Sequence, residues 1–202
     1  MKKNKLLCLF LLTSMVYPDA MTQFKKFAAN SKTMRAEFIQ TVATINKTET
    51  ATGILEISRP NKFRWTYNMP YQQVIIGHNK TLWIYDIPLA QVTKKSMDSL
   101  MSPAYEILLS GSSHIEKNYQ LTNDQSANNL EWLNGKAKKM TNIFRSVRMG
   151  FHNNLLVEME LIDRFNQKIT LQFTHMQTNM PIASKRFMMT YPKGVNVLTE
   201  GL

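Results

Sequence analysis

The feature that most constrains this chain is an alternation of apolar and polar residues that recurs in short segments separated by turn residues. The clearest case is residues 62–67, where Phe63, Trp65 and Tyr67 fall on one face and polar residues on the other. A period of two is typical of strands that bury one face. Segments with strand character are residues 37–42, 53–58, 62–67, 73–76, 81–85, 90–94, 119–121, 129–133, 142–151, 155–162, 168–175 and 186–190. Roughly ten to eleven short strands at this spacing predict a mainly β fold, an antiparallel sheet that curls into a barrel or half barrel.

Two stretches break the β rhythm and favour helices. Residues 21–34 place apolar side chains three and four positions apart, which suits a helix that packs on a flat surface. Residues 96–111 contain two possible helix starts, at Ser96 and Ser102, and Gly111 follows the second piece. Because both pieces are apolar, we expect these short helices to cover one mouth or one face of the curved sheet.

The beginning of the chain has the layout of a secretory signal peptide. Three lysines precede the apolar run LLCLFLL, and the small residue Ala20 ends the segment. The apolar run is too short to cross a bilayer. A buried N-terminal helix is the alternative interpretation. We expect residues 1–20 to be removed on export and residues 21–202 to form one domain.

Charge adds a weaker constraint. The formal net charge is +11, which by itself suggests nucleic acid or an anionic membrane as a partner. Export removes most nucleic-acid roles, and we expect no nucleic-acid partner. The densest basic group runs from Lys136 to Arg148 and does not form the block of a nucleic-acid arm. This group is either a solvated face or a docking patch for an acidic partner or a lipid headgroup layer.

The sequence carries no signature of catalysis, metal binding or nucleotide binding. Residues 110–114 come nearest to a nucleophile elbow but lack its second glycine. The histidines are isolated, and the single cysteine excludes a Cys-based zinc site. Glu158 and Glu160 share one face of a predicted strand, where the alternation indicates solvent-facing carboxylates. We therefore expect a binding protein that is not an enzyme and holds no metal or cofactor.

An ordered set of motifs points to a known family. In chain order the motifs are FIQ at residues 38–40, GILEISRPNKFRW at 53–65, LWIYD at 82–86, QVT at 91–93, SP at 102–103, ID at 162–163 and YPKGV at 191–195. Together they resemble the periplasmic outer-membrane lipoprotein carrier proteins, the LolA family, and the likeness runs from residue 24 to residue 198. The family usually has Asp-Gly in the turn before the LW strand, where this chain has His78-Asn79.

The resemblance implies a fold and a task. The family fold is an incomplete, half-open antiparallel barrel with short helices as a lid over an apolar cavity, and the cavity takes the acyl chains of a lipoprotein. A carrier of this kind accepts its cargo from an ATP-driven complex in the inner membrane and delivers it to a receptor on the outer membrane. The resemblance therefore implies a periplasmic carrier of acylated lipoproteins, and we expect it to be a monomer.

The resemblance also suggests site residues. By motif match, Arg59 is the residue that latches the lid in the closed, empty form, although an ordinary arginine at a strand end is the alternative. Whether the aromatic face of residues 63–67 lines a cavity or fills a plain core stays open. The candidate lining residues are Phe38, Leu55, Ile57, Phe63, Trp65, Tyr67, Trp83, Met97, Met101 and Leu108.

Two other functions remain possible at this point. A related lipid or glycolipid binder of the same fold, such as the outer-membrane receptor, would carry a lipidated cysteine at the cleavage site. Cys8 lies inside the apolar run, which argues against that interpretation. An exported lipid hydrolase would need a nucleophile and a base, for which Ser112 and His114 are the nearest candidates.

Overall fold

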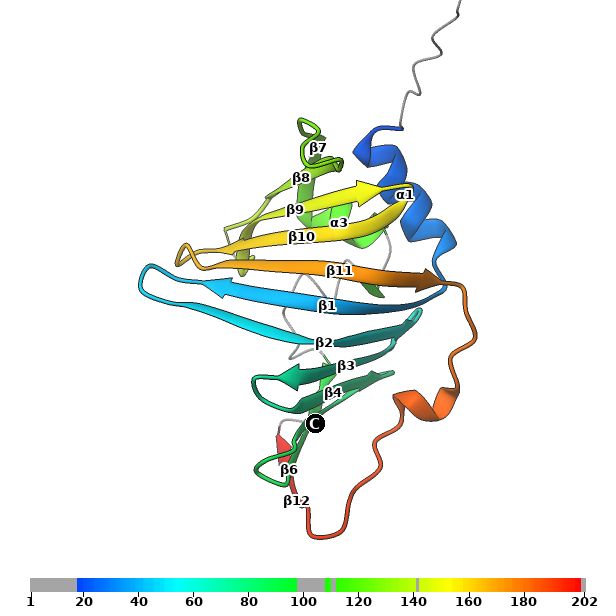
Figure 1. Ribbon diagram of the computed structural model, residues 1–202, viewed down its shortest axis with the longest axis vertical. Helices are drawn as coiled ribbons and strands as arrows, with labels where there is room; N and C mark the ends of the chain where they lie inside the picture. The colour runs from blue at the N-terminus through cyan, green and yellow to red at the C-terminus, as the bar shows by residue number, and fades with distance from the viewer. Residues whose placement is uncertain (1–17, 98–107, 110–111, 141, 201–202) are drawn as a thin grey trace, which may run out of the picture.

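The computed structural model describes residues 18–97, 108–109, 112–140 and 142–200, and these form one twelve-stranded sheet with a few short helices (Figure 1). The predicted leader therefore lies almost wholly outside the described residues. The strands are β1 (Thr33–Ala43), β2 (Thr48–Ser58), β3 (Lys62–Met69), β4 (Gln73–His78), β5 (Thr81–Asp86), β6 (Gln91–Ser96), β7 (Tyr119–Asn123), β8 (Glu131–Ala137), β9 (Phe144–His152), β10 (Leu155–Asp163), β11 (Lys168–Thr178) and β12 (Asn196–Glu200).

The sheet is built from two sets of hairpins that meet in the middle. Its spatial order is β12-β6-β5-β4-β3-β2-β1-β11-β10-β9-β8-β7, so that β1 pairs with β11 at the centre. In this spatial order every two neighbouring strands between β6 and β7 are antiparallel, and β12 runs parallel to β6. The described strands β12 and β7 form the two edges, so the sheet is open. This confirms the prediction of a mainly β, incomplete antiparallel barrel, with twelve strands where ten to eleven were expected.

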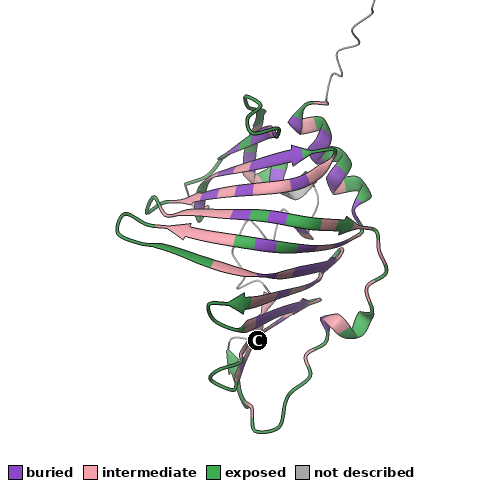
Figure 2. Ribbon diagram, in the orientation of Figure 1, coloured by how far each residue is buried: buried purple, intermediate pink, exposed green. Residues whose placement is uncertain are grey.

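The apolar core lies on the concave face of the sheet. Along β3 the alternation in sequence reappears as an alternation in burial, with Phe63 and Trp65 buried and Lys62 and Arg64 half-buried. Figure 2 shows the same striping along the central strands. The core also extends across the second half of the sheet, where Leu171, Phe173 and their neighbours continue it. One face of the sheet thus needs a cover, and helices supply part of it.

Helix α1 (Ala20–Asn30) covers one end of the concave face. The Asp19 carboxylate caps the helix by accepting a hydrogen bond from a first-turn backbone N–H at 2.7 Å. Phe24 and Phe27 lie on the buried stripe of the helix, with ring centroids 6.0 and 6.1 Å from that of Phe151 on β9. Burial of these rings therefore fixes α1 against the sheet.

The predicted helix of residues 21–34 is too long. The chain leaves the helix at Ser31 and enters β1, where Met34 is buried. Met34 fits both periods, because it continues the helical stripe and also starts the strand alternation of Met34, Ala36 and Phe38. A residue that satisfies two periods cannot mark the boundary between them.

The predicted helical insertion of residues 96–111 falls mostly outside the described residues. Ser102 and residues 98–107 are not described, whereas Leu108 and Leu109 are helical. Helix α3 (Ser112–Asn118) then leads into β7 and contacts α1. The described parts of this region therefore lie on the covered side of the sheet together with α1.

The C-terminal segment crosses the convex face. We name residues 179–195 the C-terminal strap. The strap contains the short helix η2 (Ser184–Phe187), which contacts β3 and β4 and buries Phe187. The strand predicted over residues 186–190 is therefore wrong. Phe187 is the one buried residue of η2, and this single buried side chain in a crossing segment resembled the alternation of a strand. Beyond the strap, β12 adds to the sheet edge, and no strand was predicted there.

Candidate functional site

The aromatic side chains of β3 lie on the concave face and contact a ring of β1. The centroid of the Phe38 ring lies 5.2 Å from that of Trp65 and 5.2 Å from that of Tyr67, edge-on in both cases. Trp65 and Tyr67 stack with centroids 6.3 Å apart. Such ring pairs add to the stabilisation that burial alone provides. These three rings form one continuous aromatic surface.

Strand β2 extends this surface with aliphatic side chains. The register places Leu55 opposite Trp65 and Ile57 opposite Phe63. All four side chains are buried and belong to one apolar cluster. Because directly opposed residues of an antiparallel pair share a face, strands β1 to β3 present a contiguous apolar face to the cover. The structure therefore brings six of the predicted lining residues together.

The cover contributes Met97 and Leu108. Leu108 is buried within the same apolar cluster, and Met97 packs against that cluster. The Met97 methyl group lies so close to Gly77 that a Cβ at position 77 would be 2.5 Å from it. The absence of a side chain at Gly77 thus lets the cover approach the sheet. Met101, the remaining predicted residue of this segment, lies outside the described residues.

The apolar surface is covered in this form of the protein. Four hollows of about 580, 370, 400 and 430 Å³ occur among the described residues. None of these four is lined by a residue of the predicted set. The hollow of about 430 Å³ comes nearest to the aromatic face, because it is lined by Gln40, which accepts a hydrogen bond from the Tyr67 hydroxyl at 3.0 Å.

Arg59, the residue after β2, joins the covering segments to the sheet. Its Nη1 donates a hydrogen bond to the Ala28 carbonyl of α1 at 2.5 Å, and its Nε donates one to the Leu108 carbonyl at 2.9 Å. The guanidinium carbon lies 5.6 Å from the centroid of the Phe27 ring. A single side chain thus bridges α1, the segment containing Leu108 and the end of β2.

The Arg59 guanidinium is largely removed from water. Its Nη2 is buried without a hydrogen-bond partner, and burial lowers the pKa of Arg59, although the group stays charged. Both acceptors are neutral carbonyls, and a charged donor binds a carbonyl more strongly than a neutral donor does. The unsatisfied Nη2 opposes this gain, because a buried donor without a partner costs free energy. Arg59 thus ties α1 and the segment containing Leu108 to the end of β2 through two hydrogen bonds, with one buried donor left without a partner.

Trp83 does not belong to the aromatic surface, which corrects the sequence prediction. The register pairs it with Ile76 and puts both side chains on the convex face. There the Trp83 Nε1 donates to the Tyr191 hydroxyl of the C-terminal strap at 3.0 Å. Its neighbour Leu82 is the fully buried residue of β5. Both faces of β5 are apolar in sequence, so the alternation could not distinguish them.

Comparison with known proteins places the chain in a family. The family model described as "Outer membrane lipoprotein carrier protein LolA" matches residues 29–190. An outer-membrane lipoprotein carrier protein of Chromobacterium violaceum is 44% identical over 181 residues, covering 90% of this chain and 88% of that protein. A protein of the same description from Nitrosospira multiformis is 35% identical over 207 residues, covering 99% of this chain and 100% of that protein. The chain belongs to the LolA family.

Solved structures share the fold of this LolA-family chain. An uncharacterized conserved protein from Thermus thermophilus aligns with a TM-score of 0.58 at 12% identity, covering 89% of this chain and 96% of that protein. A putative outer membrane lipoprotein-sorting protein domain from Vibrio parahaemolyticus gives 0.50 at 12% identity, covering 83% of this chain and 95% of that one. At this identity the likeness concerns the fold alone.

The LolA family is a family of carriers. Ser112 and His114 lie at the start of α3, but their side chains are outside the described part of the chain. In residues 18–97, 108–109, 112–140 and 142–200, no group of three His, Cys, Asp or Glu side chains is placed to hold a metal ion. Within the same ranges no helix is long and apolar enough to cross a membrane.

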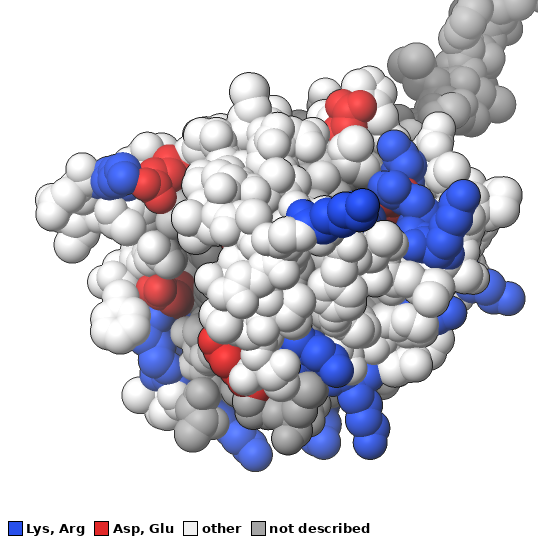
Figure 3. Space-filling view, turned by 90° about the horizontal axis from the view of Figure 1, so that it is seen from below, with Lys and Arg blue, Asp and Glu red and all other residues white. Residues whose placement is uncertain are grey.

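A buried carboxylate on the convex face holds the C-terminal strap, and sequence reasoning missed it. Glu56 is only 2% exposed and accepts hydrogen bonds from Arg186 of η2 and, at 2.9 Å, from Arg35 of β1. Arg64 Nη1 donates to the Arg186 carbonyl at 3.4 Å, and burial, followed by repulsion from Arg186, lowers the pKa of Arg64. Figure 3, which views the molecule from below, shows more Lys and Arg than Asp and Glu on that face. The sequence alone could not reveal this ion cluster, because Glu56 and Arg186 are far apart along the chain.

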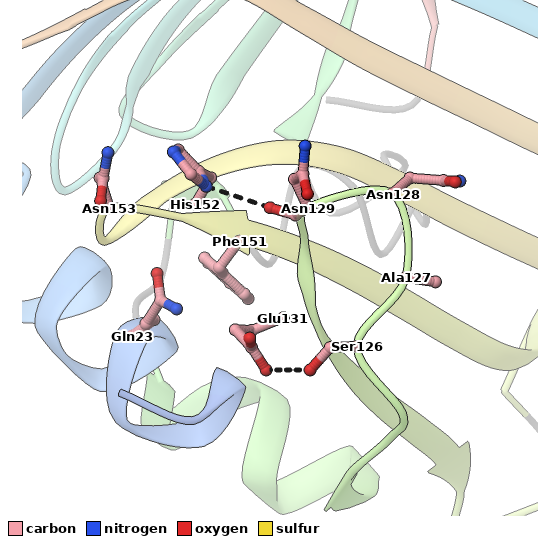
Figure 4. Close-up of a pocket in the computed structure, with 9 residues that line it drawn as sticks. All are labelled: Gln23, Ser126, Ala127, Asn128, Asn129, Glu131, Phe151, His152 and Asn153. Atoms are coloured by element: carbon pink, nitrogen blue, oxygen red, sulfur yellow. Dashed lines mark hydrogen bonds between the residues drawn. The ribbon is translucent and has the colours of Figure 1, made fainter. Parts of the chain in front are cut away.

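A polar hollow of about 580 Å³ lies beside the start of α1 (Figure 4). The His152 Nδ1 lies 3.0 Å from the Asn129 carbonyl oxygen, and the Ser126 hydroxyl donates to Glu131 at 2.5 Å. Phe151 is buried at its floor, so it offers the hollow almost no apolar surface. The amide, hydroxyl and carboxylate groups of this lining do not suit hydrocarbon. The concave face offers a more apolar surface than this hollow does.

Proposed function

We propose that this LolA-family protein is a periplasmic carrier that holds the acyl chains of lipoproteins against its apolar concave face. The observation that carries the proposal is the continuous surface of Phe38, Trp65 and Tyr67 beneath segments that Arg59 fastens. A plain core would not need a charged latch at its cover. A carrier does, because its cover must open for each cargo molecule and close again afterwards.

The energetics of acyl burial support a cover that can be displaced. Each methylene removed from water contributes about 0.8 kcal/mol, so a chain that buries ~14 of them gains on the order of 10 kcal/mol before entropic costs. Breaking the two hydrogen bonds of Arg59 costs about 1.5–3 kcal/mol each, because the donor is charged. The gain from burying one acyl chain therefore exceeds the cost of opening the latch.

A competing cover also makes release possible. Cargo and cover bind the same apolar face, so the apparent affinity for cargo is lowered by the population of the closed form. Without that competition the full gain of acyl burial would make the cargo difficult to unload. The latch at Arg59 thus sets how tightly cargo is held in addition to keeping the empty carrier closed.

The partners follow from this cycle as part of the proposal. Lipoproteins do not leave a membrane spontaneously, because their acyl chains would enter water. An ATP-driven complex in the inner membrane would load the carrier, and a receptor on the outer membrane would take the cargo. The carrier would act as a monomer, since the apolar face is covered within a single chain.

Competition between acyl ligands tests the proposal. A fluorescent fatty-acyl probe bound to the leader-free protein should be displaced by an acylated lipoprotein and not by the same lipoprotein without acyl chains. Equal competition by the two forms would refute recognition of the acyl chains. Native mass spectrometry of the protein isolated from periplasm should in addition detect bound acylated lipoprotein.

A further inference from the structure

Three neighbouring turns at one end of the sheet expose large apolar side chains. They are the β1–β2 turn (residues 44–47), the β8–β9 turn (residues 138–143) and the β10–β11 turn (residues 164–167). Their residues Ile45, Met140 and Phe165 are 92%, 84% and 88% exposed, the highest values among the exposed large apolar side chains of the described residues. The β1–β2 and β10–β11 turns project at the left of Figure 1 and are largely exposed in Figure 2. These side chains add nothing to the core, so their position calls for a different explanation.

The three turns form one surface. Ile45 and Phe165 line the same hollow of about 370 Å³ between the β1–β2 and β10–β11 turns. Arg164 joins the β10–β11 turn to the β8–β9 turn, since its Nη1 lies 3.8 Å from the Met140 sulfur and its Nε donates to the Asn142 carbonyl at 2.8 Å. We name the set Ile45, Met140 and Phe165 the apolar tip.

Hydrogen bonds hold these turns in shape. One Asp163 carboxylate oxygen accepts from the backbone N–H groups of Phe165 and Gln167, each at 2.8 Å. In the β1–β2 turn the Thr44 hydroxyl accepts from the backbone N–H of Lys47 at 3.1 Å. Ile45 and Phe165 are thus presented by turns with internal hydrogen bonds, which reduces the entropy lost when these side chains contact a partner.

Cations outnumber anions around the apolar tip, although Lys47 is ion-paired with Glu49 of β2 and Asp163 lines the hollow between the β1–β2 and β10–β11 turns. The three turns contain four cations, Lys47, Lys138, Lys139 and Arg164, and no aspartate or glutamate. Lys138 and Lys139 are exposed. Protruding apolar side chains flanked by cations are the arrangement with which proteins bind anionic lipid, because the apolar groups enter the acyl boundary and the cations stay at the phosphates.

We propose that the apolar tip is a membrane-contact site that binds the surface of an anionic phospholipid bilayer reversibly. This site lies outside the apolar concave face, and the proposal does not depend on the carrier function. A lipid surface fits better than a protein, because three nearly fully exposed side chains on convex turns need a soft surface that yields around them. Lys47 is paired with Glu49, so the attraction comes from Lys138, Lys139 and Arg164, at about 1 kcal/mol each near an anionic surface, which is enough for weak and reversible binding.

Vesicle co-sedimentation of the leader-free protein tests the proposal. The protein should bind vesicles of phosphatidylcholine mixed equally with phosphatidylglycerol and should bind pure phosphatidylcholine vesicles far less. Added salt should weaken the binding, because it screens exposed charges. The double variant Ile45→Ser with Phe165→Ser should lose affinity about tenfold or more, since two apolar side chains no longer enter the bilayer. Lys139→Gln should lose about fivefold, as expected for one cation near an anionic surface.

Matched controls separate the tip from general hydrophobicity and charge. Met188→Ser removes an exposed apolar residue from the C-terminal strap, and Lys32→Gln removes an exposed cation at the other end of β1. Both should bind mixed vesicles like the unchanged protein. The proposal would be overturned if the double tip variant bound mixed vesicles as tightly as the unchanged protein does. It would also be overturned if the unchanged protein bound the two vesicle types equally. A double variant that binds vesicles normally but no longer transfers lipoprotein to the receptor would show that the tip is a protein interface, which also overturns it.

Discussion

Replacing Arg59 by leucine should tighten acyl binding and slow the release of cargo. The change removes the hydrogen bonds to the Ala28 and Leu108 carbonyls, which are worth about 1.5–3 kcal/mol each for a charged donor. Part of this lost free energy is offset, because the variant no longer buries a charged group whose Nη2 lacks a hydrogen-bond partner. A net loss of about 2 kcal/mol from the closed form would raise the apparent affinity for acyl ligands about 30-fold where the closed form dominates.

Equilibrium titration and stopped-flow displacement of a fluorescent fatty-acyl probe measure this effect. Arg145→Leu, the same change at an exposed position of β9, is the matched control and should behave like the unchanged protein. Arg59→Lys should have an apparent affinity for the probe between those of Arg59→Leu and the unchanged protein, because an ammonium group lacks the planar fork that reaches both carbonyls. The urea midpoint of each variant checks that the fold is intact. If Arg59→Leu bound and released the probe like Arg145→Leu, Arg59 would have no role as a latch.

Three further predictions concern other parts of the fold. Burial raises the pKa of Tyr67 from 10.0 to about 12, so the neutral phenol stabilises the fold below pH 10 and this contribution is lost as the pH rises toward 12. Ultraviolet titration should detect a tyrosine that ionises near pH 12 and that Tyr67→Phe removes, and an unchanged titration curve in Tyr67→Phe would contradict this. Glu56→Gln takes the carboxylate from Arg186 and should lower the free energy of unfolding in urea by about 3 kcal/mol, whereas a loss below about 1 kcal/mol would argue against a structural ion cluster. Gly53→Ala would bring a Cβ to 1.9 Å from the Thr66 carbonyl oxygen, so the β2–β3 pair must shift and the melting temperature should fall clearly; an unchanged melting temperature would exclude so close an approach.

The local pattern of the sequence predicts most of the sheet. The alternation along β3 correctly places Phe63 and Trp65 on the covered face, because a strand puts every second side chain on one side. The turn at residues 77–80 is also confirmed, since His78 pairs with Thr81 across a tight connection. The strand alternation and the tight turn are set by residues that are close in sequence, so one sequence is enough to predict them.

Features that depend on distant partners were not predictable in the same way. Trp83 was assigned to the wrong face because both faces of β5 are apolar. Only its pairing with Ile76 shows that its side chain lies on the convex face. The parallel pairing of β12 and the contact between Glu56 and Arg186 join segments more than a hundred residues apart. No periodic signal marks such contacts. The covered state of the aromatic face also comes from tertiary packing and not from the strand pattern.

Quenching of tryptophan fluorescence by brominated acyl chains tests acyl binding at the concave face most directly. The chain contains three tryptophans, and the register puts Trp65 on the covered face and Trp83 on the convex one. A variant that retains Trp65 alone should be strongly quenched by a lipoprotein with brominated acyl chains, because bromine quenches only near contact. A variant that retains Trp83 alone should keep its fluorescence. Quenching of Trp83 without quenching of Trp65, or no quenching of either by bound lipoprotein, would show that the acyl chains lie elsewhere.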